Sequence, residues 1–354
     1  MKKFKNPLSF QVDYDRESIF KVATDKEKQE QTFMRPSTSF LGDAIRRFKR
    51  NKIAVVSLFF IVFILLAIFL IPVFYPYTYD QQLGIQPGKA VDDTFNNLPP
   101  FAYSTSEQVR ISAGEFIWPH LFGTDQLGRD YFIRVIYGAR VSLMVGFFAA
   151  IIVLIIGTIY GSISAFSGGK VDMVMMRIVD VIYSLPDMVI IILLSVVLKQ
   201  AFNFEGTFLD KVGTPLISIF VVYALLYWVG MARLVRGQVL SVKQTEYVLA
   251  SRSIGTSTGM TIRKHIIPNC LSVIIVSATL QVPSAIFTES FLSFIGLGVS
   301  APMPSLGSLA SDAVSALSNR PYLLLIPAIF ICLIVLALNL MGDGLRDAFD
   351  PKQR

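Results

Sequence analysis

Histidine and cysteine are almost absent from this chain of 354 residues, which contains only two of each. Cys270 and Cys332 both fall at or inside apolar stretches, so neither a disulfide framework nor a CxxC site is expected. His120 and His265 are too few to supply a histidine-based metal site. The sequence therefore predicts no resident metal and no redox centre.

Enzymatic motifs are also lacking. The segments nearest to a phosphate-binding loop are Ser167–Lys170 and Gly255–Gly259, and neither has the GxxxxGK[ST] spacing. The residues Phe166–Gly169 are faintly similar to an intramembrane serine protease, but no histidine lies within a span to act as the base. Gly342–Gly344, with its central aspartate, sits at a membrane edge rather than in mid-bilayer, which weakens an aspartyl-protease reading. No residue set is expected to be catalytic, and no cofactor is expected to bind this chain.

Charged residues are scarce, at 16% of the chain against 53% hydrophobic residues. The mean hydropathy is +0.58. A soluble domain of this composition could not cover its surface with polar groups, so an integral membrane protein is indicated. The net charge of +7 would suit nucleic acid, but the basic residues flank apolar stretches, so lipid rather than nucleic acid is the expected partner.

Six apolar stretches each approach the roughly 20 residues that cross a bilayer. They are about Ile53–Tyr75, Val141–Phe166, Met173–Leu198, Pro215–Val235, Cys270–Phe294 and Tyr322–Met341. Stretches of this length are helices rather than barrel strands, because backbone groups in hydrocarbon must bond internally. The sequence predicts an all-α membrane protein with six transmembrane helices, kinked near Pro186 and Pro283.

Lysine and arginine counts set the expected orientation. Residues 1–52 hold 13 basic and 7 acidic residues, 233–269 hold six basic residues and one acid, and 76–140 hold five basic and seven acidic residues. Both termini are therefore expected in the cytoplasm. The predicted parts are a basic tail (1–52), a first span (53–75), an extracytoplasmic loop (76–140), a core with five spans and a cytoplasmic loop at about 233–269 (141–342), and a C-terminal tail (343–354).

The extracytoplasmic loop divides into an irregular part and a regular part. Residues 120–140 are predicted to form a helix on the outer membrane surface, capped by Thr124 or Asp125, before the chain turns into the second span. Asp125 and Asp130 are five residues apart and do not stack as a carboxylate pair on one helical face, so we interpret them as a cap and a surface charge.

Ionisable residues inside spans are costly and are functional candidates by default. Asp187 lies in the middle of the third span and Glu289 in the outer part of the fifth. Each is expected to face other helices or a translocation pathway, and for Glu289 a structural hydrogen-bonding role is an equal alternative. Asp180 can pair with Arg177, and Gly157 with Gly161 favours close helix packing.

The polar stretch 245–268 reads as two short helices joined by a glycine. Thr245 is a plausible N-cap, and Tyr247, Ala250, Ser251 and Ile254 form one compact face at helical spacing. Gly255 suits a left-handed helix end, Thr256 or Ser257 can cap a second helix, and Pro268 is expected to stop it. A small-residue face beside a glycine turn suits a closely docked partner; the alternative is an ordinary solvated loop.

The chain resembles the permease subunits of bacterial ABC importers, in the dipeptide, oligopeptide and nickel branch, C-type subunit. The resemblance covers roughly residues 40–354. The motifs that carry it are Phe48–Lys52, His120–Asp130, Tyr137–Arg140 with Ser142, Gly168-Gly169 with Asp172, Met176-Arg177 with Asp180, Met231–Arg233, Val235–Gln238, Glu246-Tyr247, Ile286–Gly298 and Gly342–Asp347 with Asp350-Pro351.

In that family a loop with the pattern EAA, three residues, Gly, nine residues and I-x-L-P inserts in a groove of a separate ATPase. The matching positions here are Leu249-Ala250-Ser251, Gly255 and His265–Pro268, with Leu249 in place of the glutamate and Glu246 three residues upstream. The resemblance implies that the ATPase-coupling residues are Glu246, Tyr247, Leu249, Ala250, Ser251, Arg252, Ile254, Gly255, His265 and Pro268. Without a glutamate at Leu249, docking is expected to lean on the Ala250, Ser251 and Gly255 face.

The resemblance further implies the MetI-like permease fold and a transport system around it. The expected partners are a homologous permease, two cytoplasmic ABC ATPases that use ATP and magnesium, and an extracytoplasmic peptide-binding lipoprotein, all at the bacterial inner membrane. The expected activity is uptake of oligopeptides by alternating access. Dipeptides, nickel or another small solute remain alternatives, as do two other classes: an ion-coupled secondary transporter using Asp187 and Glu289, and a non-transporting receptor or scaffold.

Overall fold

The computed structural model describes residues 40–85, 90–201, 214–299 and 301–349. These residues form helices and connecting segments, and their one strand-like contact is an isolated bridge between Thr124 and Asp130. The chain divides into two compact units, Met1–Asp43 and Ala44–Arg354, of which the second holds the helical body. The expected basic tail lies largely outside the described residues, apart from helix α3 (Phe40–Arg50).

Among the described residues, five helices are long and apolar enough to cross a membrane. They are α4 (Lys52–Phe74), α6 (Tyr131–Ser167), a continuous helix Leu216–Lys243, a continuous helix Thr258–Phe294, and α15 (Tyr322–Phe349). A sixth span exists if α7 (Gly169–Tyr183) and α8 (Asp187–Ala201) are counted together, although they are bent by 87°. The prediction of an all-helical protein with several apolar spans is confirmed, with five or six of them in the described part.

The prediction of a separate surface helix over 120–140 is wrong, because α6 runs without interruption from Tyr131 to Ser167. Its cap is neither Thr124 nor Asp125 but Asp130, whose Oδ1 accepts the Ile133 amide hydrogen at 3.0 Å. A different short helix, α5 (Thr105–Ser112), lies earlier in this region and is closed by a capping box between Ser104 and Glu107.

Three apolar helices continue further than their hydropathy indicates. The helix Leu216–Lys243 runs through most of α9 (Thr214–Val222), the π turn η3 (Tyr223–Tyr227) and α10 (Trp228–Lys243), so 233–243 are helical rather than loop. The helix Thr258–Phe294 consists of α12 (Thr258–Thr261), the π turn η4 (Ile262–Ile266) and α13 (Ile267–Phe294). Helix α15 likewise takes in 343–349, which were expected to be tail.

Pro268 does not stop its helix, contrary to expectation. It lies in the first turn of α13, directly after the π turn η4. Ile267 donates its amide hydrogen to the carbonyl of Ile262, five residues back, instead of to the usual fourth. The wider turn absorbs the hydrogen bond that a proline cannot donate, and the helix continues.

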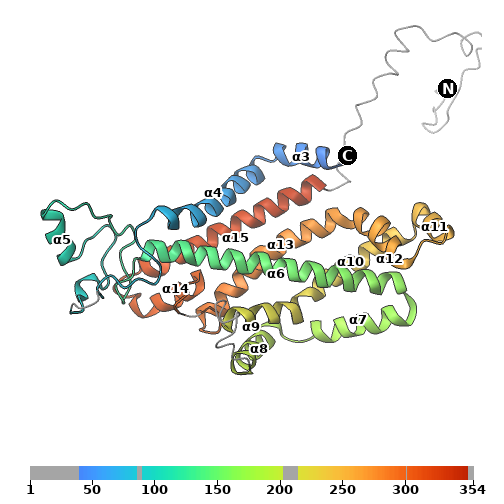
Figure 1. The fold of residues 1–354 in the computed structure, drawn as a ribbon. Coiled ribbons are helices and arrows are strands. Elements are labelled where there is room, and N and C mark those ends of the chain that lie inside the picture. The colour runs from blue at the N-terminus through green and yellow to red at the C-terminus, as the bar shows by residue number, and fades with distance from the viewer. Residues whose placement is uncertain (1–39, 86–89, 202–213, 300, 350–354) are drawn as a thin grey trace, which may run out of the picture. The chain divides into compact units, whose positions relative to one another are not determined.

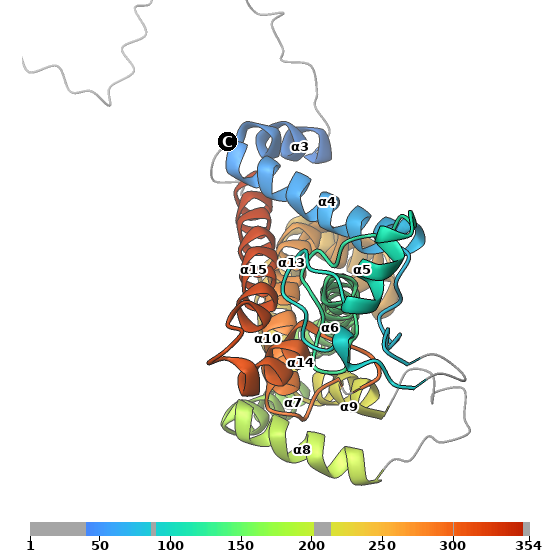
Figure 2. The ribbon, with the colours of Figure 1, turned by 90° about the vertical axis from the view of Figure 1, so that its left-hand side faces the viewer.

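Helix α6 is the centre of the packing. In Figure 2 it is seen nearly end on, with α4 above it, α15 to one side and α9 below. One buried cluster joins α6 to α4, α13, α14 (Leu306–Ala313) and α15 and includes Leu143, Ile286 and Ile334. The predicted close packing at Gly157 and Gly161 is confirmed: a Cβ at Gly157 would lie 2.5 Å from Met231 Cβ, and one at Gly161 would lie 2.4 Å from the Ala232 carbonyl oxygen.

Candidate functional site

The stretch 245–268 lies at the end of the helices opposite α5, where it forms a hairpin of α11 (Glu246–Ser253) and α12 (Figure 1). Gly255 has φ +82°, as predicted for a left-handed helix end. The amide of Gly255 donates to the carbonyl of Arg252, and that of Thr256 to the carbonyl of Ser251, which is the Schellman pattern. Thr245 is the N-cap residue, but its hydroxyl donates to the Val242 carbonyl instead of accepting from α11.

Most of the hairpin is exposed, with one inward stripe. Val248 and Ser251 are buried, whereas Ile254 is 84% exposed and Tyr247 and Leu249 are about half exposed. Ser251 therefore does not belong to an outward docking face, which corrects the expected Ala250, Ser251 and Gly255 surface. The correction follows from packing: α11 touches the protein body through the narrow arc that Val248 and Ser251 share.

The remaining predicted coupling residues lie around this exposed hairpin. Glu246 begins α11, where its carboxylate is favourable to the helix dipole, and is exposed together with Ala250, Arg252, Gly255 and Pro268; His265 is half-buried. A Cβ at Gly255 would meet no atom within 4 Å. The outward face is therefore small, partly apolar and sterically open.

The base of the hairpin is fixed to the long helices. Val248 of α11 and Ile266 of η4 belong to a buried cluster with Phe166 of α6 and Val235 and Val239 of α10. Both side chains are completely buried. A displacement of α11 would therefore be carried into α6, α10 and α13, because close-packed side chains transmit strain.

Two ion pairs attach α7 to α10 in the same half of the protein. Arg236 donates from Nε and an Nη to both carboxylate oxygens of Asp172, at 2.7 and 2.6 Å, and Ser164 donates to the same carboxylate. Asp180 pairs with Arg233 at 2.7 Å and not with Arg177 as expected, because α10 lies alongside α7. The two parallel hydrogen bonds between Arg236 and Asp172 fix both the distance and the relative orientation of α7 and α10.

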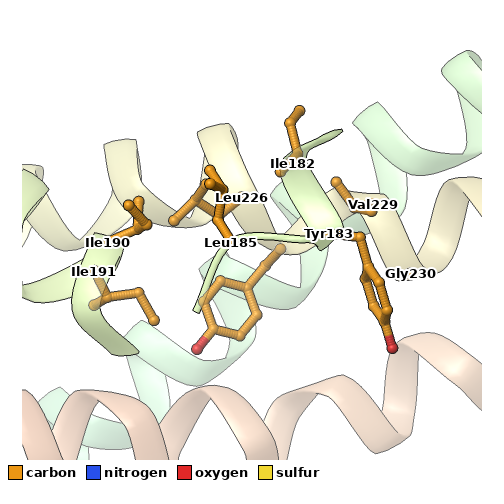
Figure 3. Close-up of a pocket in the computed structure, with 9 residues that line it drawn as sticks. Ile182, Tyr183, Leu185, Ile190, Ile191, Leu226, Val229 and Gly230 are labelled. Carbon is orange, nitrogen blue, oxygen red and sulfur yellow. The ribbon is translucent and has the colours of Figure 1, made fainter. Parts of the chain in front are cut away.

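The third apolar stretch is broken rather than kinked. Leu185 precedes Pro186, which disfavours helical backbone there, and α8 starts afresh at Asp187. The break faces the π turn η3, and a cavity of about 100 Å³ separates them; its walls include Leu185, Ile190 and Leu226 (Figure 3). The side chain of Asp187, one of the two pathway candidates, lies outside the described residues.

Glu289, the other pathway candidate, is completely buried between helices. Its carboxylate accepts hydrogen bonds from the hydroxyls of Ser142 at 2.6 Å and Ser293 at 2.7 Å. Ser293 in turn accepts the amide hydrogen of Val299. In this conformation the carboxylate links α6 and α13 to the segment after α13 through hydrogen bonds, and its role in lining a pathway stays a prediction.

A buried cluster of charged residues at the α5 end was not predicted from the sequence. His120 is completely buried, with Nδ1 2.7 Å from Asp130 Oδ2 and Nε2 3.3 Å from Glu107 Oε1. Asp130 also caps α6, and Asp125 pairs with the buried Arg134, so neither aspartate is the surface charge expected. The histidine and its partners are 10 and 13 residues apart, which left no spacing signal to join them.

Burial by itself lowers the pKa of His120, but its hydrogen bonds to Asp130 and Glu107 outweigh burial and raise the pKa to about 9. Burial would also raise the pKa of Glu107, yet the contact with His120 leaves it lowered. His120 is therefore a cation at neutral pH. It holds α5 and the start of α6 together through two carboxylates.

We expect the region 90–130 to loosen as pH rises. A histidine whose folded pKa exceeds its ordinary 6.5 contributes stability that is complete below pH 6.5 and is lost as pH passes about 9. Resistance of this region to proteolysis in the detergent-purified protein should fall across that window. His120→Gln should be less resistant at pH 6 and should show no such slope; an equal slope in both proteins would contradict the assignment.

Comparisons with known proteins agree with one another. A family model described as a binding-protein-dependent transport system inner membrane component matches residues 157–354. A second, described as the N-terminal TM domain of oligopeptide transport permease C, matches residues 39–100.

Curated relatives match nearly the whole chain. The dipeptide transport system permease protein DppC of Bacillus subtilis is 43% identical, over 95% of this chain and 93% of the relative. The oligopeptide transport system permease proteins OppC of Bacillus subtilis and Haemophilus influenzae are 41% and 42% identical, over 95% and 89% of this chain and 98% and 90% of the relatives. The chain belongs to the family of binding-protein-dependent transport system inner membrane components.

Proposed function

We propose that this protein is the C-type permease subunit of an ATP-driven importer of oligopeptides in the bacterial inner membrane. One observation carries the proposal: the α11–α12 hairpin is exposed on its outer face and anchored to three long helices on its inner face. The relatives named for oligopeptide and dipeptide transport support the substrate class. Peptides share a backbone rather than a side chain, so selectivity is expected to reside mainly in the protein that delivers them.

The hairpin is proposed to dock on a cytoplasmic ATPase. Its exposed Tyr247, Ala250 and Ile254 follow one another at helical spacing, and Gly255 leaves room for close approach. Exposed apolar groups gathered at one tip of a protein mark an interaction surface. The ATPases would bind ATP and magnesium, and this chain would convert their closure into alternating access of the pathway.

The other partners follow from the same assignment. A homologous permease would complete the pathway, which would then form between the two chains. The region 75–130 would face an extracytoplasmic peptide-binding lipoprotein, with both termini of this chain in the cytoplasm. The basic 233–269 segment at the hairpin end supports that orientation.

The test is uptake of a radiolabelled oligopeptide by vesicles containing the complete importer. Uptake should require ATP and the binding protein and should stop when the ATPases carry an inactivating substitution. Uptake that persists without ATP hydrolysis but follows an ion gradient would instead support a secondary transporter. A chain that purifies without any ATPase, and whose removal leaves peptide uptake unchanged, would support a receptor or scaffold.

A further inference from the structure

The C-terminal end of α6 is held by a side chain from another helix. A helix leaves its last four carbonyls without internal partners. Here the Gly168 amide donates to Ser164, while Lys243 Nζ donates to the carbonyls of Ala165 at 3.1 Å and Phe166 at 2.7 Å. Lys243 is the last residue of α10, directly before the hairpin. Its cation is also favourable to the negative end of the α6 dipole.

The aromatic ring of Phe166 lies close to two cationic side chains, one at the end of α10 and one in α11. Lys243 Nζ lies 5.3 Å and the Arg252 guanidinium 5.5 Å from its centroid. Both distances are within the range of cation–π attraction. Arg252 belongs to α11 itself, so Phe166 is a residue of α6 that contacts the end of α10 and the docking helix together.

The turn after Phe166 is tightly constrained. Gly168 and Gly169 have φ +66° and +54°, left-handed conformations that glycine adopts readily, and they lead into α7. Asp172, in the first turn of α7, is held by Ser164 of α6 and Arg236 of α10. A displacement of the C-terminal end of α6 would therefore also displace the start of α7.

We propose that Phe166, held by Lys243 and Arg252, is the positioning residue through which movement of α11 reaches the α6–α7 turn. The proposal rests on the proposed function, in which α11 docks on an ATPase. Packing of Val248 in the buried cluster resists a push of α11 into the protein. The cation–ring contacts and the Lys243–carbonyl bonds resist a pull in the opposite direction. The hairpin is thus connected to α6 for movement both inward and outward.

The experiment compares Phe166→Leu with Phe166→Tyr in the complete importer reconstituted with its ATPases and binding protein. Leucine keeps an apolar side chain in the cluster but removes the aromatic face, whereas tyrosine retains that face. Phe147→Leu, on the same helix and 40% exposed, is the matched control. Peptide uptake, ATP hydrolysis and co-elution of the ATPases are measured on the same preparations.

We expect Phe166→Leu to lower the amount of peptide taken up per ATP hydrolysed by about fivefold or more. A fivefold effect is at about the lower end of the range found when two distant sites are coupled. ATP hydrolysis and co-elution should stay close to those of the unaltered importer. Phe166→Tyr and Phe147→Leu should retain the ratio. A purely structural role for Phe166 would lower assembly and both activities together, and would not be corrected selectively by tyrosine.

A second pair of variants covers the case in which Phe166→Leu does not assemble. Arg252 is exposed, so Arg252→Gln is tolerable for folding, and it should lower uptake per ATP while Arg252→Lys retains it. Unchanged uptake per ATP in an assembled Phe166→Leu importer, or in Arg252→Gln where Phe166→Leu does not assemble, would overturn the relay and leave the proposed function intact. An unaltered importer that takes up no peptide with ATP would overturn the proposed function itself.

Discussion

Gly255→Trp should abolish peptide uptake while the chain still inserts and folds. Gly255 is exposed at the hairpin tip, and a Cβ there would meet no atom of this protein within 4 Å. The indole would therefore project outward, into the space that a docked partner must occupy. We expect uptake to fall by more than about tenfold, which corresponds to a loss of about 1.4 kcal/mol in docking. The measurement is ATP-driven uptake in vesicles normalised to the amount of inserted chain.

The control for this variant separates bulk from backbone strain. With φ +82° at Gly255, any L-residue there bears a conformational cost of about 1–2 kcal/mol, which asparagine tolerates best. Gly255→Asn should therefore retain most uptake. Normal uptake in the tryptophan variant would refute close docking, and equal loss in both variants would point to strain in the turn instead.

Gly161→Leu should prevent stable folding. A Cβ at Gly161 would lie 2.4 Å from the Ala232 carbonyl oxygen and 3.0 Å from the Arg236 amide nitrogen, both backbone atoms of α10 that cannot move aside like a side chain. Separating α6 from α10 would also open the buried cluster that supports α11. We expect a loss of about 3 kcal/mol or more, the upper range for overpacking. The thermal unfolding midpoint of the purified protein and its yield in membranes measure the effect.

Two glycines of the facing helix provide the comparison. A Cβ at Gly230 or Gly237 of α10 would meet no atom within 4 Å, and both have ordinary helical backbone. Alanine at either position should leave stability unchanged or raise it by about 0.5–1 kcal/mol, because it reduces the freedom of the unfolded chain. A Gly161→Leu protein as stable as Gly237→Ala would show that α6 and α10 are not packed as closely as described.

The apolar elements could be predicted from sequence because their signal is local. Hydropathy over a stretch such as 53–75 identifies helix α4 to within a residue or two at each end. Three of the helix ends that were predicted wrongly lie where polar residues continue a helix beyond the apolar stretch. At 131–140 and 233–243, and again at 343–349, backbone hydrogen bonding proceeds although hydropathy has fallen. Hydropathy reports the solvent around a helix, not the residue at which its hydrogen bonds end.

The hairpin was recognisable, but the direction of its faces was not. The helix–glycine–helix form and the left-handed Gly255 follow from residue types at fixed spacing. Spacing places Ser251 on the same side of α11 as Tyr247 and Ile254, yet only the neighbouring helices decide where that side turns inward. They cover Val248 and Ser251 and leave Ile254 exposed.

The sequence by itself determined the membrane class, the apolar helices, the family resemblance and the hairpin, because each is written in composition or in short-range order. Only the tertiary structure decided which charges meet. Asp180 pairs with Arg233, 53 residues away, and His120 lies between Asp130 and Glu107. Glu289 is enclosed by serines that include Ser142, 147 residues distant. The sequence shows that a charged side chain inside the protein needs a polar partner. Only the packing of the helices determines which residue that partner is.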